Sequence, residues 1–280
     1  MGAPAAPGPG DLMLTVAAVR RYPVKSMLGE ELGRAIVDEA GVAKDRQYAV
    51  IDQQTGMVAS AKQPRLWRDL LTATAVGNGD SVLIRLPGYG EHEVGDPALD
   101  DLLSRFIGRP VRLADVPTGS GQIERADPDQ VSLHGVDAEV DAPTLTLGGG
   151  SPGPTFRDYA PLHLITTATL RELGTTAVRY RPNLVLETPV GVAPFAENEW
   201  VGSSITVGQD LVLRVVMLTP RCAVPTLRHG DLPADRNALR AAHRSNRVDV
   251  PGHGINPCAG VYATVEHGGT VQVGDAAIRH

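Results

Sequence analysis

Short runs of apolar and β-branched residues, divided by glycine and proline, constrain the fold of this chain more than any other feature. The 280 residues include 31 glycines and 22 prolines. The runs span residues 14–21, 34–38, 47–52, 70–76, 81–86, 111–113, 183–187, 205–207, 211–218, 260–265 and 270–273. Such runs are typical of strands, and the Gly, Pro or Asn-Gly between them is typical of turns. The sequence therefore predicts a mainly β protein.

Helix signals occur in three places. Asp96 is a suitable N-cap, Pro97 suits the first helical position, and Gly108 suits the end of the same helix. Two further short helices are expected at residues 167–173 and 235–245. A few helices among many strands predict the α+β class.

The chain is long enough for two domains, and its composition indicates where they meet. Residues 117–129 are polar and irregular, so we place the boundary there. The start of the chain, rich in Gly, Ala and Pro, reads as a disordered tail. We therefore expect a tail at residues 1–12, a first domain that forms a barrel or sandwich at 13–120, and a second domain at 121–280.

Charge and cysteine content exclude several classes of protein. The net charge of −6 gives no overall basic field, so no nucleic-acid partner is expected and any anion site must be a local pocket. Two cysteines do not make a disulfide framework, which favours free thiols in a reducing cytoplasm. The start lacks the features of a signal peptide, and no segment has the roughly 20 apolar residues of a membrane span. We expect a soluble cytoplasmic protein without a membrane partner.

Cys222 lies in a short loop that follows the apolar run 211–218. Arg221 precedes it, and Pro220 and Pro225 stiffen the backbone on either side. A neighbouring guanidinium favours the thiolate, which can hold a soft metal. The alternative is that Cys222 is a small buried core residue, as most free cysteines are.

Other site patterns are weaker. Residues 148–153 match G-x-G-x-x-G, but Pro152 and Pro154 prevent an immediate helix, so a loop is expected rather than a dinucleotide site. No Gly-x-Ser-x-Gly elbow of a hydrolase occurs. His229, His243, His253 and Cys258 could join Cys222 at zinc, although their spacing matches no compact Cys/His motif.

Several fragments accompany the Cys222 loop in a fixed order. They are Arg-Tyr-Pro-Val-Lys-Ser at 21–26, Asp-Arg at 45–46, Ala-Lys-Gln-Pro-Arg-Leu at 61–66, the segment 162–170, Arg-Tyr-Arg-Pro-Asn-Leu-Val at 179–185, and Gly-Thr-Val-Gln-Val-Gly-Asp at 269–275. With these fragments the chain resembles the MOSC proteins, in particular the two-part group that includes the mitochondrial amidoxime-reducing components. The resemblance implies an N-terminal β-barrel domain at 13–120 and a MOSC β-barrel domain at 121–280.

The same resemblance implies a molybdenum cofactor and assigns residues to it. Cys222 would be the metal ligand, and the cofactor contacts would be Lys25, Ser26, Arg46, Thr166, Thr167, Arg181, Asn183 and Arg221. Phosphate suits cations and the amide groups at a helix start, and a thiolate completes the shell of a soft metal. Asp158 and His163 could supply an acid and a base beside a substrate, or they could be structural.

The implied activity is reduction of an N-hydroxylated or N-oxide small molecule, with electrons from a separate flavin or iron-sulfur donor protein. Two alternatives stay open: a cofactor carrier or sulfur-transfer protein that uses Cys222, and a specialised biosynthetic enzyme on the same scaffold. Many relatives follow the ligand cysteine with Asp-Pro-x-Thr-Gly, whereas residues 226–233 here read Thr-Leu-Arg-His-Gly-Asp-Leu-Pro. We expect this loop to border the site and to favour neutral or anionic substrates. Pyridoxal phosphate is not expected, because Lys25 is better used as a cofactor contact.

Overall fold

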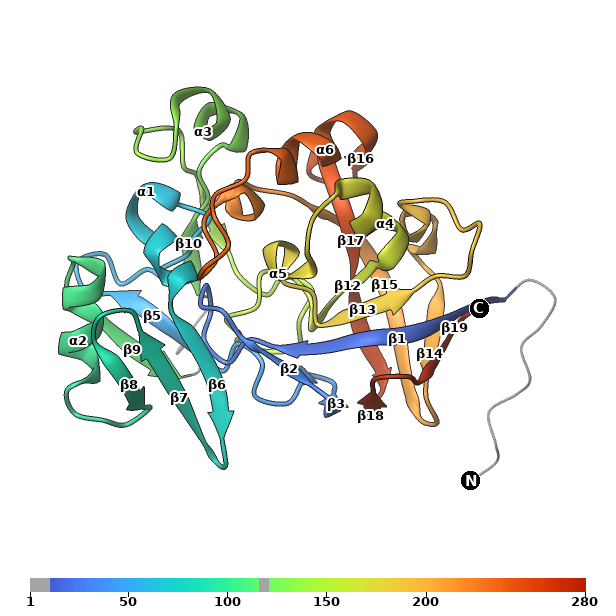
Figure 1. Ribbon diagram of the computed structural model, residues 1–280, viewed down its shortest axis with the longest axis horizontal. Coiled ribbons are helices and arrows are strands. Elements are labelled where there is room, and N and C mark those ends of the chain that lie inside the picture. The colour runs from blue at the N-terminus through green and yellow to red at the C-terminus, as the bar shows by residue number, and fades with distance from the viewer. Residues whose placement is uncertain (1–10, 116–120) are drawn as a thin grey trace.

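Seven strands close into a barrel that forms the larger part of the molecule (Figure 1). The computed structural model describes residues 11–115 and 121–280. The barrel strands are β1 (Leu12–Arg21), β12 (Leu162–Thr166), β13 (Leu184–Glu187), β14 (Ser204–Val207), β15 (Leu211–Pro220), β17 (Gly254–His267) and β19 (Ala276–Arg279). They pair in the order β12-β13-β1-β19-β14-β15-β17, and β17 pairs with β12 to close the ring. The predicted mainly β fold is confirmed.

An odd number of strands determines how the ring is connected. Strand directions cannot alternate around seven strands, so one neighbouring pair must be parallel. That pair is β12 and β13, and all the other barrel pairs are antiparallel. Parallel neighbours need a crossover connection, which here contains α4 (Thr167–Leu173) and α5 (Ala177–Tyr180). The residues at the end of this crossover reappear in the functional site.

The barrel interior is a continuous apolar core. On β15, Leu211, Leu213 and Val215 are fully buried and alternate with more exposed residues, as expected of a strand with one face inside. Trp200, from the 3₁₀ helix η2 (Ala196–Trp200), fills part of the same core. β2 (Glu30–Leu32) pairs with β1, and β16 (Arg247–Val250) pairs with β17.

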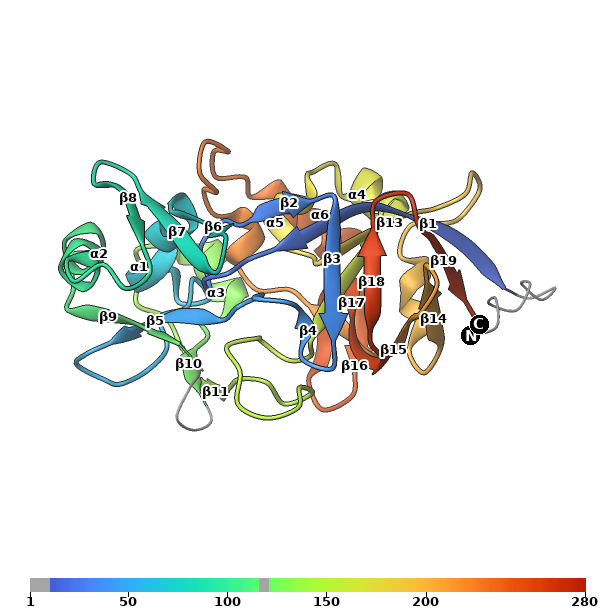
Figure 2. The same ribbon diagram turned by 90° about the horizontal axis from the view of Figure 1, so that it is seen from below.

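The first strands of the chain are built into the second half of the molecule. β1 lies between β13 and β19, and β3 (Arg34–Asp38) pairs with β4 (Gly41–Val42) and β18 (Gly269–Gln272) (Figure 2). Strand pairing therefore crosses the division proposed at residue 120. The domain bounds 13–120 and 121–280 remain a prediction about which segments fold together.

The smaller part of the molecule has a separate core. Its sheets are β5 (Tyr48–Asp52) with β9 (Val111–Asp115), and β6 (Thr74–Asn78), β7 (Ser81–Leu86) and β8 (Gly90–Glu93). Its helices are α1 (Pro64–Trp67), the 3₁₀ helix η1 (Arg68–Thr72) and α2 (Leu99–Ile107). Val50, Ile84 and Leu103 are fully buried between the sheets and α2.

The remaining elements cover the region between the two parts. They are β10 (Gln122–Glu124), β11 (Thr144–Thr146), α3 (Pro128–His134), the 3₁₀ helix η3 (Val224–Thr226) and α6 (Asn237–Ser245). None of the helices among the described residues is long and apolar enough to cross a membrane.

Three local predictions were wrong at their edges. The predicted strand 70–76 contains the end of η1, because Leu70 and Leu71 face the core in a helical turn before β6 begins. α2 begins at Leu99, although the Asp96 carboxylate accepts a hydrogen bond from Ala98 N at 2.9 Å. The predicted tail at residues 1–12 is too long, because Leu12 already pairs with Arg279 in the barrel. Its residues 1–10 lie outside the described chain, as do 116–120 at the predicted domain boundary.

Candidate functional site

A cavity between the smaller part and the barrel collects most of the predicted site residues. We call it the cationic cavity. Among the described residues, its charged lining groups are the cations Lys25, Arg46, Lys62, Arg157, Arg179, Arg181 and Arg221 and the single carboxylate Asp158. Ser26, His163, Asn183, Cys222 and Tyr262 also line it. Seven cations around one carboxylate make a site for an anion.

Three of these residues have an unusual backbone. Ser26, Arg46 and Arg181 have φ angles of 64°, 49° and 56°, in the left-handed region that non-glycine residues rarely adopt. The described chain has only two other non-glycine residues of this kind, Lys44 and Phe195. Such strain persists where the surrounding structure fixes it, and it concentrates at functional sites.

Asp158 joins the two lysines of the cavity. Its carboxylate contacts Lys25 Nζ at 2.6 Å and Lys62 Nζ at 3.1 Å, and Lys25 Nζ also donates to the carbonyl of Phe156 at 2.9 Å. Burial alone would raise the pKa of Asp158, but the two ammonium groups hold it well below its ordinary value. Burial lowers the pKa of Lys25 to about 8 against the pull of Asp158. Asp158 is therefore ionised and is not arranged to act as an acid.

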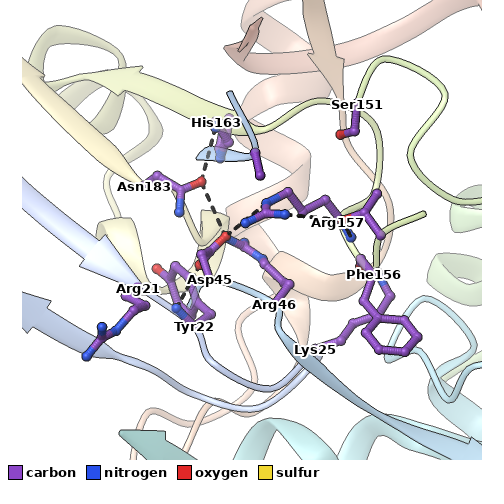
Figure 3. Close-up of polar contacts among 12 residues, drawn as sticks. Arg21, Tyr22, Lys25, Asp45, Arg46, Ser151, Phe156, Arg157, His163 and Asn183 are labelled. Atoms are coloured by element: carbon purple, nitrogen blue, oxygen red, sulfur yellow. Dashed lines mark hydrogen bonds and ion pairs between the residues drawn. The ribbon is translucent and has the colours of Figure 1, made fainter. Parts of the chain in front are cut away.

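Arg46 is held by partners from both parts of the molecule. Its Nη1 donates to Asp45 at 2.6 Å and to Asn183 Oδ1 at 3.3 Å (Figure 3). Its Nη2 donates to the Arg181 carbonyl at 3.2 Å. Asn183 Oδ1 also accepts from the backbone N–H of His163 at 3.2 Å. Asp45 is almost fully buried. The amide of Asn183 is thus used to position Arg46 and β12.

Arg181 retains hydrogen-bonding capacity. Its Nη1 is buried and has no hydrogen-bond partner among the described residues. Burial, reinforced by the charge of Arg46, lowers the pKa of Arg181 to about 10. Both guanidinium groups lie over the ring of Tyr22, 4.4 Å (Arg181) and 4.6 Å (Arg46) from its centroid. A buried donor without a partner is costly, so an acceptor at this point would be favourable.

Arg221 and His163 form a buried pair in the wall of the cationic cavity. Arg221 donates to the carbonyls of Ala259 and Tyr180 and to Nε2 of His163. Burial and the nearby guanidinium hold the pKa of His163 well below its ordinary value, so the ring is neutral. Because Nε2 already accepts from Arg221, His163 has no free lone pair with which to act as a base.

The two cysteines have different environments. Cys222 follows Pro220, where β15 ends, and lines the cationic cavity with 8% of its surface exposed. Cys258 lies fully buried within the barrel core, and burial raises the pKa of its thiol to about 11. Only Cys222 is placed to contact a ligand of the cationic cavity.

Thr166 and Thr167 do not line the cavity. The hydroxyl of Thr166 caps α4 and donates to the buried carboxylate of Glu197 at 3.0 Å, which Thr169 also contacts at 2.9 Å. Thr167 lies within hydrogen-bond distance of the hydroxyl of Thr188, at 3.4 Å. The hydroxyl groups at this helix start are therefore bonded to the protein's own Glu197, whose pKa is raised by burial, and the structure does not bring Thr166 and Thr167 to the cavity.

The loop after Cys222 is anchored by hydrogen bonds from one buried arginine. Arg179 donates to the carbonyls of Pro225, Leu227 and Pro233 at 3.3, 3.0 and 2.6 Å. His229, expected to border the site, is 1% exposed, and burial lowers its pKa to about 4. It cannot meet a substrate at the surface.

Sequence reasoning assigned no site role to Lys62, Arg157 or Arg179. Lys62 and Arg179 lay inside the fragments that carried the resemblance, and Arg157 directly precedes the assigned Asp158. A cation inside such a fragment, or next to an assigned residue, was the sequence signal that could have found these three residues. His243, considered for zinc, instead lies 3.5 Å from Asp129 on α3.

Comparisons with known proteins agree with this architecture. A family model of the MOSC N-terminal beta barrel domain matches residues 13–101, and one of the MOSC domain matches residues 155–277. The chain is 25% identical to mitochondrial amidoxime reducing component 2 of Homo sapiens, over 95% of this chain and 83% of that protein. It is 26% identical to mitochondrial amidoxime-reducing component 1 of Mus musculus, over 93% and 81%.

Among solved structures, the YUAD protein from Bacillus subtilis matches 96% of this chain and 97% of its own, with 10% identity and a TM-score of 0.43. The two family models together cover most of the sequence, in the order that the fold shows. The chain therefore belongs to the MOSC family and carries both the N-terminal beta barrel domain and the MOSC domain.

Proposed function

We propose that this protein binds a molybdenum cofactor in the cationic cavity and reduces N-hydroxylated or N-oxide compounds. The observation that carries the proposal is the set of seven cations around one carboxylate, with Cys222 in the same wall. A phosphate-bearing ligand needs the cations, and a soft metal needs the thiolate. The names of the relatives, amidoxime-reducing components, support the reaction class.

The residues present fit such a cofactor. The groups with spare capacity for its phosphate are Arg181, whose Nη1 lacks a partner, and Lys62 and Arg157. Arg46 would hold Arg181 in place through the hydrogen bond from its Nη2 to the Arg181 carbonyl. Asn183 would hold Arg46 in turn, by accepting from its Nη1. Cys222 would be the protein ligand of the metal.

The cavity must widen to take a ligand of that size. Its volume is about 90 Å³, whereas small-molecule sites commonly have roughly 300 to 1,000 Å³. Lys25 and Lys62 are held inward by Asp158. An arriving phosphate would compete with this carboxylate for both ammonium groups, which would release the side chains that narrow the space.

The catalytic roles considered for Asp158 and His163 become positioning roles. Asp158 is ionised and holds two lysines, and His163 is neutral and accepts from Arg221. When bound, the cofactor would supply the two electrons that, together with two protons, cleave the N–O bond and release its oxygen as water. A separate electron-donor protein, of the flavin or iron-sulfur type, would restore those electrons.

Expression in a host competent for molybdenum cofactor synthesis tests the proposal. We expect stoichiometric molybdenum and pterin after gel filtration, and turnover of benzamidoxime with a chemical reductant. Cofactor-free protein without turnover would refute it. Retained cofactor without turnover would favour a carrier, and a labile persulfide on Cys222 would favour sulfur transfer.

A further inference from the structure

A second cavity lies between α3, the segment after Cys222 and α6. Its volume is about 340 Å³, which is within the range of roughly 300 to 1,000 Å³ typical of small-molecule sites. We refer to it as the second cavity.

Apolar side chains form the inner wall of the second cavity. Val131 of α3, Leu227 of the segment after Cys222 and Leu239 of α6 line it and are 5%, 2% and 3% exposed. Val136 and Ala223 line it as well. Because these residues come from two helices and an anchored loop, the wall presents a preformed surface for an apolar group of a ligand.

Basic residues surround this apolar wall. Arg68, Arg228, Arg236, Arg240 and His243 line the cavity, and no Asp or Glu does so among the described residues. Arg68 contacts Asp137 at 2.7 Å, His243 contacts Asp129 at 3.5 Å, and Arg228 Nε donates to the Gly230 carbonyl at 2.8 Å.

Two of these arginines are uncommitted. In the part of the chain that the structure describes, the side chains of Arg236 and Arg240 have no hydrogen-bond or ion-pair partner. Both are exposed, Arg236 immediately before α6 and Arg240 within it. Guanidinium groups bind carboxylates with two parallel hydrogen bonds, so these two suit an acidic group at the cavity rim.

One short segment contributes residues to both cavities. Cys222, Val224 and Pro225 line the cationic cavity, whereas Ala223, Thr226 and Leu227 line the second cavity. A ligand of the second cavity would therefore lie against the residue next to the proposed metal ligand.

We infer that the second cavity binds the apolar, acid-bearing part of the substrate, so that N-oxygenated compounds with a hydrophobic body and a carboxylate are the preferred class. This substrate class depends on the proposed function. The binding site itself does not, because its apolar wall and its arginines belong to this chain and need no cofactor.

Calorimetric titration of the full chain, purified without cofactor, tests the site directly. The probes are 4-phenylbutyrate, 4-phenylbutylamine of similar shape and opposite charge, and acetate as the head group alone. We expect 4-phenylbutyrate to bind at least about tenfold more tightly than either other probe, because only it uses both the apolar wall and the arginines. Equal affinity for the acid and the amine would overturn the inference.

Variants locate the binding. Arg240→Glu should weaken 4-phenylbutyrate binding about tenfold or more, whereas Arg244→Glu, an exposed charge reversal on the same helix outside the cavity, should not. Lys62→Gln removes a cation of the other cavity and should also leave binding unchanged. A loss with Lys62→Gln and not with Arg240→Glu would place the ligand in the cationic cavity and refute the site.

Turnover separates this inference from the proposed function. With loaded enzyme, Arg240→Glu should raise KM for an amidoxime that carries a carboxylate and leave its kcat and the kinetics of benzamidoxime unchanged. Binding of 4-phenylbutyrate without any turnover would refute the proposed function and keep the site. Turnover of benzamidoxime with no binding of 4-phenylbutyrate would refute the site and keep the function.

Discussion

The cationic cavity and the second cavity differ in how their positive groups are held. In the cationic cavity, Arg46, Arg179 and Arg221 are tied to backbone carbonyls or to buried partners. In the second cavity, Arg236 and Arg240 are exposed and project from a helix surface. A change in the first set therefore alters the scaffold as well as ligand binding, whereas a change in the second set alters ligand binding alone.

The same contrast explains where backbone strain occurs. Ser26, Arg46 and Arg181 all line the cationic cavity and all have positive φ angles. No non-glycine residue that lines the second cavity does, among those described. Strain of order 1–3 kcal/mol per residue persists only where neighbours determine the geometry. In the cationic cavity, neighbouring residues therefore fix the backbone of these three residues.

The largest effect is expected at Cys222. Cys222→Ser should lower molybdenum-dependent turnover by more than about 100-fold, because the thiolate would be the metal's protein ligand, and changes to groups that only orient such ligands already cost about 10- to 100-fold. Circular dichroism and thermal unfolding should show an unchanged fold, since Cys222 lies at a cavity wall. Turnover of the N-hydroxylated substrate and metal content measure the effect.

Cys258→Ala is the matched control. It removes a sulfur from the barrel core and should cost about 1 kcal/mol of stability while turnover stays within about twofold, because Cys258 lines neither the cationic cavity nor the second cavity. Full turnover in Cys222→Ser, or equal loss in both variants, would contradict the assignment of Cys222.

Arg46 and Arg181 both have positive φ angles, but their replacement by glycine should affect the stability of the protein differently. Arg46→Gly leaves the buried carboxylate of Asp45 without its closest ion-pair partner and should destabilise the protein by about 3–5 kcal/mol. Arg181→Gly removes a buried cation with an unpartnered donor and relieves a positive φ angle. It should leave the stability of cofactor-free protein unchanged or higher, while pterin retention falls. Chemical denaturation and pterin content measure the two effects.

Similar destabilisation in both variants would contradict this contrast. It would mean that the packing of Arg181 on Tyr22 contributes more stability than the burial of the Arg181 guanidinium costs. A retained pterin in Arg181→Gly would remove Arg181 from the cofactor site.

Lys25 should make stability and anion binding depend on pH in opposite directions. Burial lowers its pKa to about 8 from 10.5. The folded chain thus holds this proton less tightly than the unfolded chain, so burial of Lys25 destabilises the protein below pH 8. As pH rises from 8 to 10.5 the penalty, about 3 kcal/mol, is relieved and stability rises. Sulfate affinity should instead fall above pH 8, by up to about tenfold, because a cation is lost.

Lys25→Met is the reference for the pH dependence of stability, and Lys25→Arg is the reference for the pH dependence of sulfate affinity. The difference between wild type and Lys25→Met isolates this group from others that titrate at high pH. Lys25→Arg stays charged and should remove the fall in sulfate affinity. A wild type that tracks Lys25→Met at every pH would show that Lys25 is not desolvated.

The sequence could predict residues whose position follows from strand order. Lys25, Arg46, Arg181 and Cys222 each lie just beyond a strand or a short helix, in fragments whose order carried the family resemblance. Residues at such ends meet at one edge of a barrel, and all four line one cavity. The mainly β fold followed from the same strand pattern.

The remaining details depend on contacts between distant segments. Thr166 has a helix-start pattern that suits phosphate, but Glu197, thirty-one residues later, fills that place. His229 has an exposed-loop sequence, yet the backbone N–H of Gly230 donates to Leu71 across the two parts of the molecule and the loop is buried. Neither outcome can be predicted from local sequence, because each depends on which segment packs opposite.

The smallest effect is expected at Arg228, where the loop 226–233 departs from the Asp-Pro-x-Thr-Gly pattern. Arg228 is an exposed residue that lines the second cavity, and among the described residues the only partner of its side chain is the Gly230 carbonyl, which accepts from its Nε. Arg228→Asp should therefore leave cofactor content unchanged and shift turnover from anionic toward cationic amidoximes by about two- to fivefold, since an exposed charge contributes about 1 kcal/mol or less. A panel of N-hydroxylated compounds of different charge, assayed on both proteins, measures the shift. Equal turnover ratios would show that this loop does not select substrate and that the difference between the two cavities has no bearing on specificity.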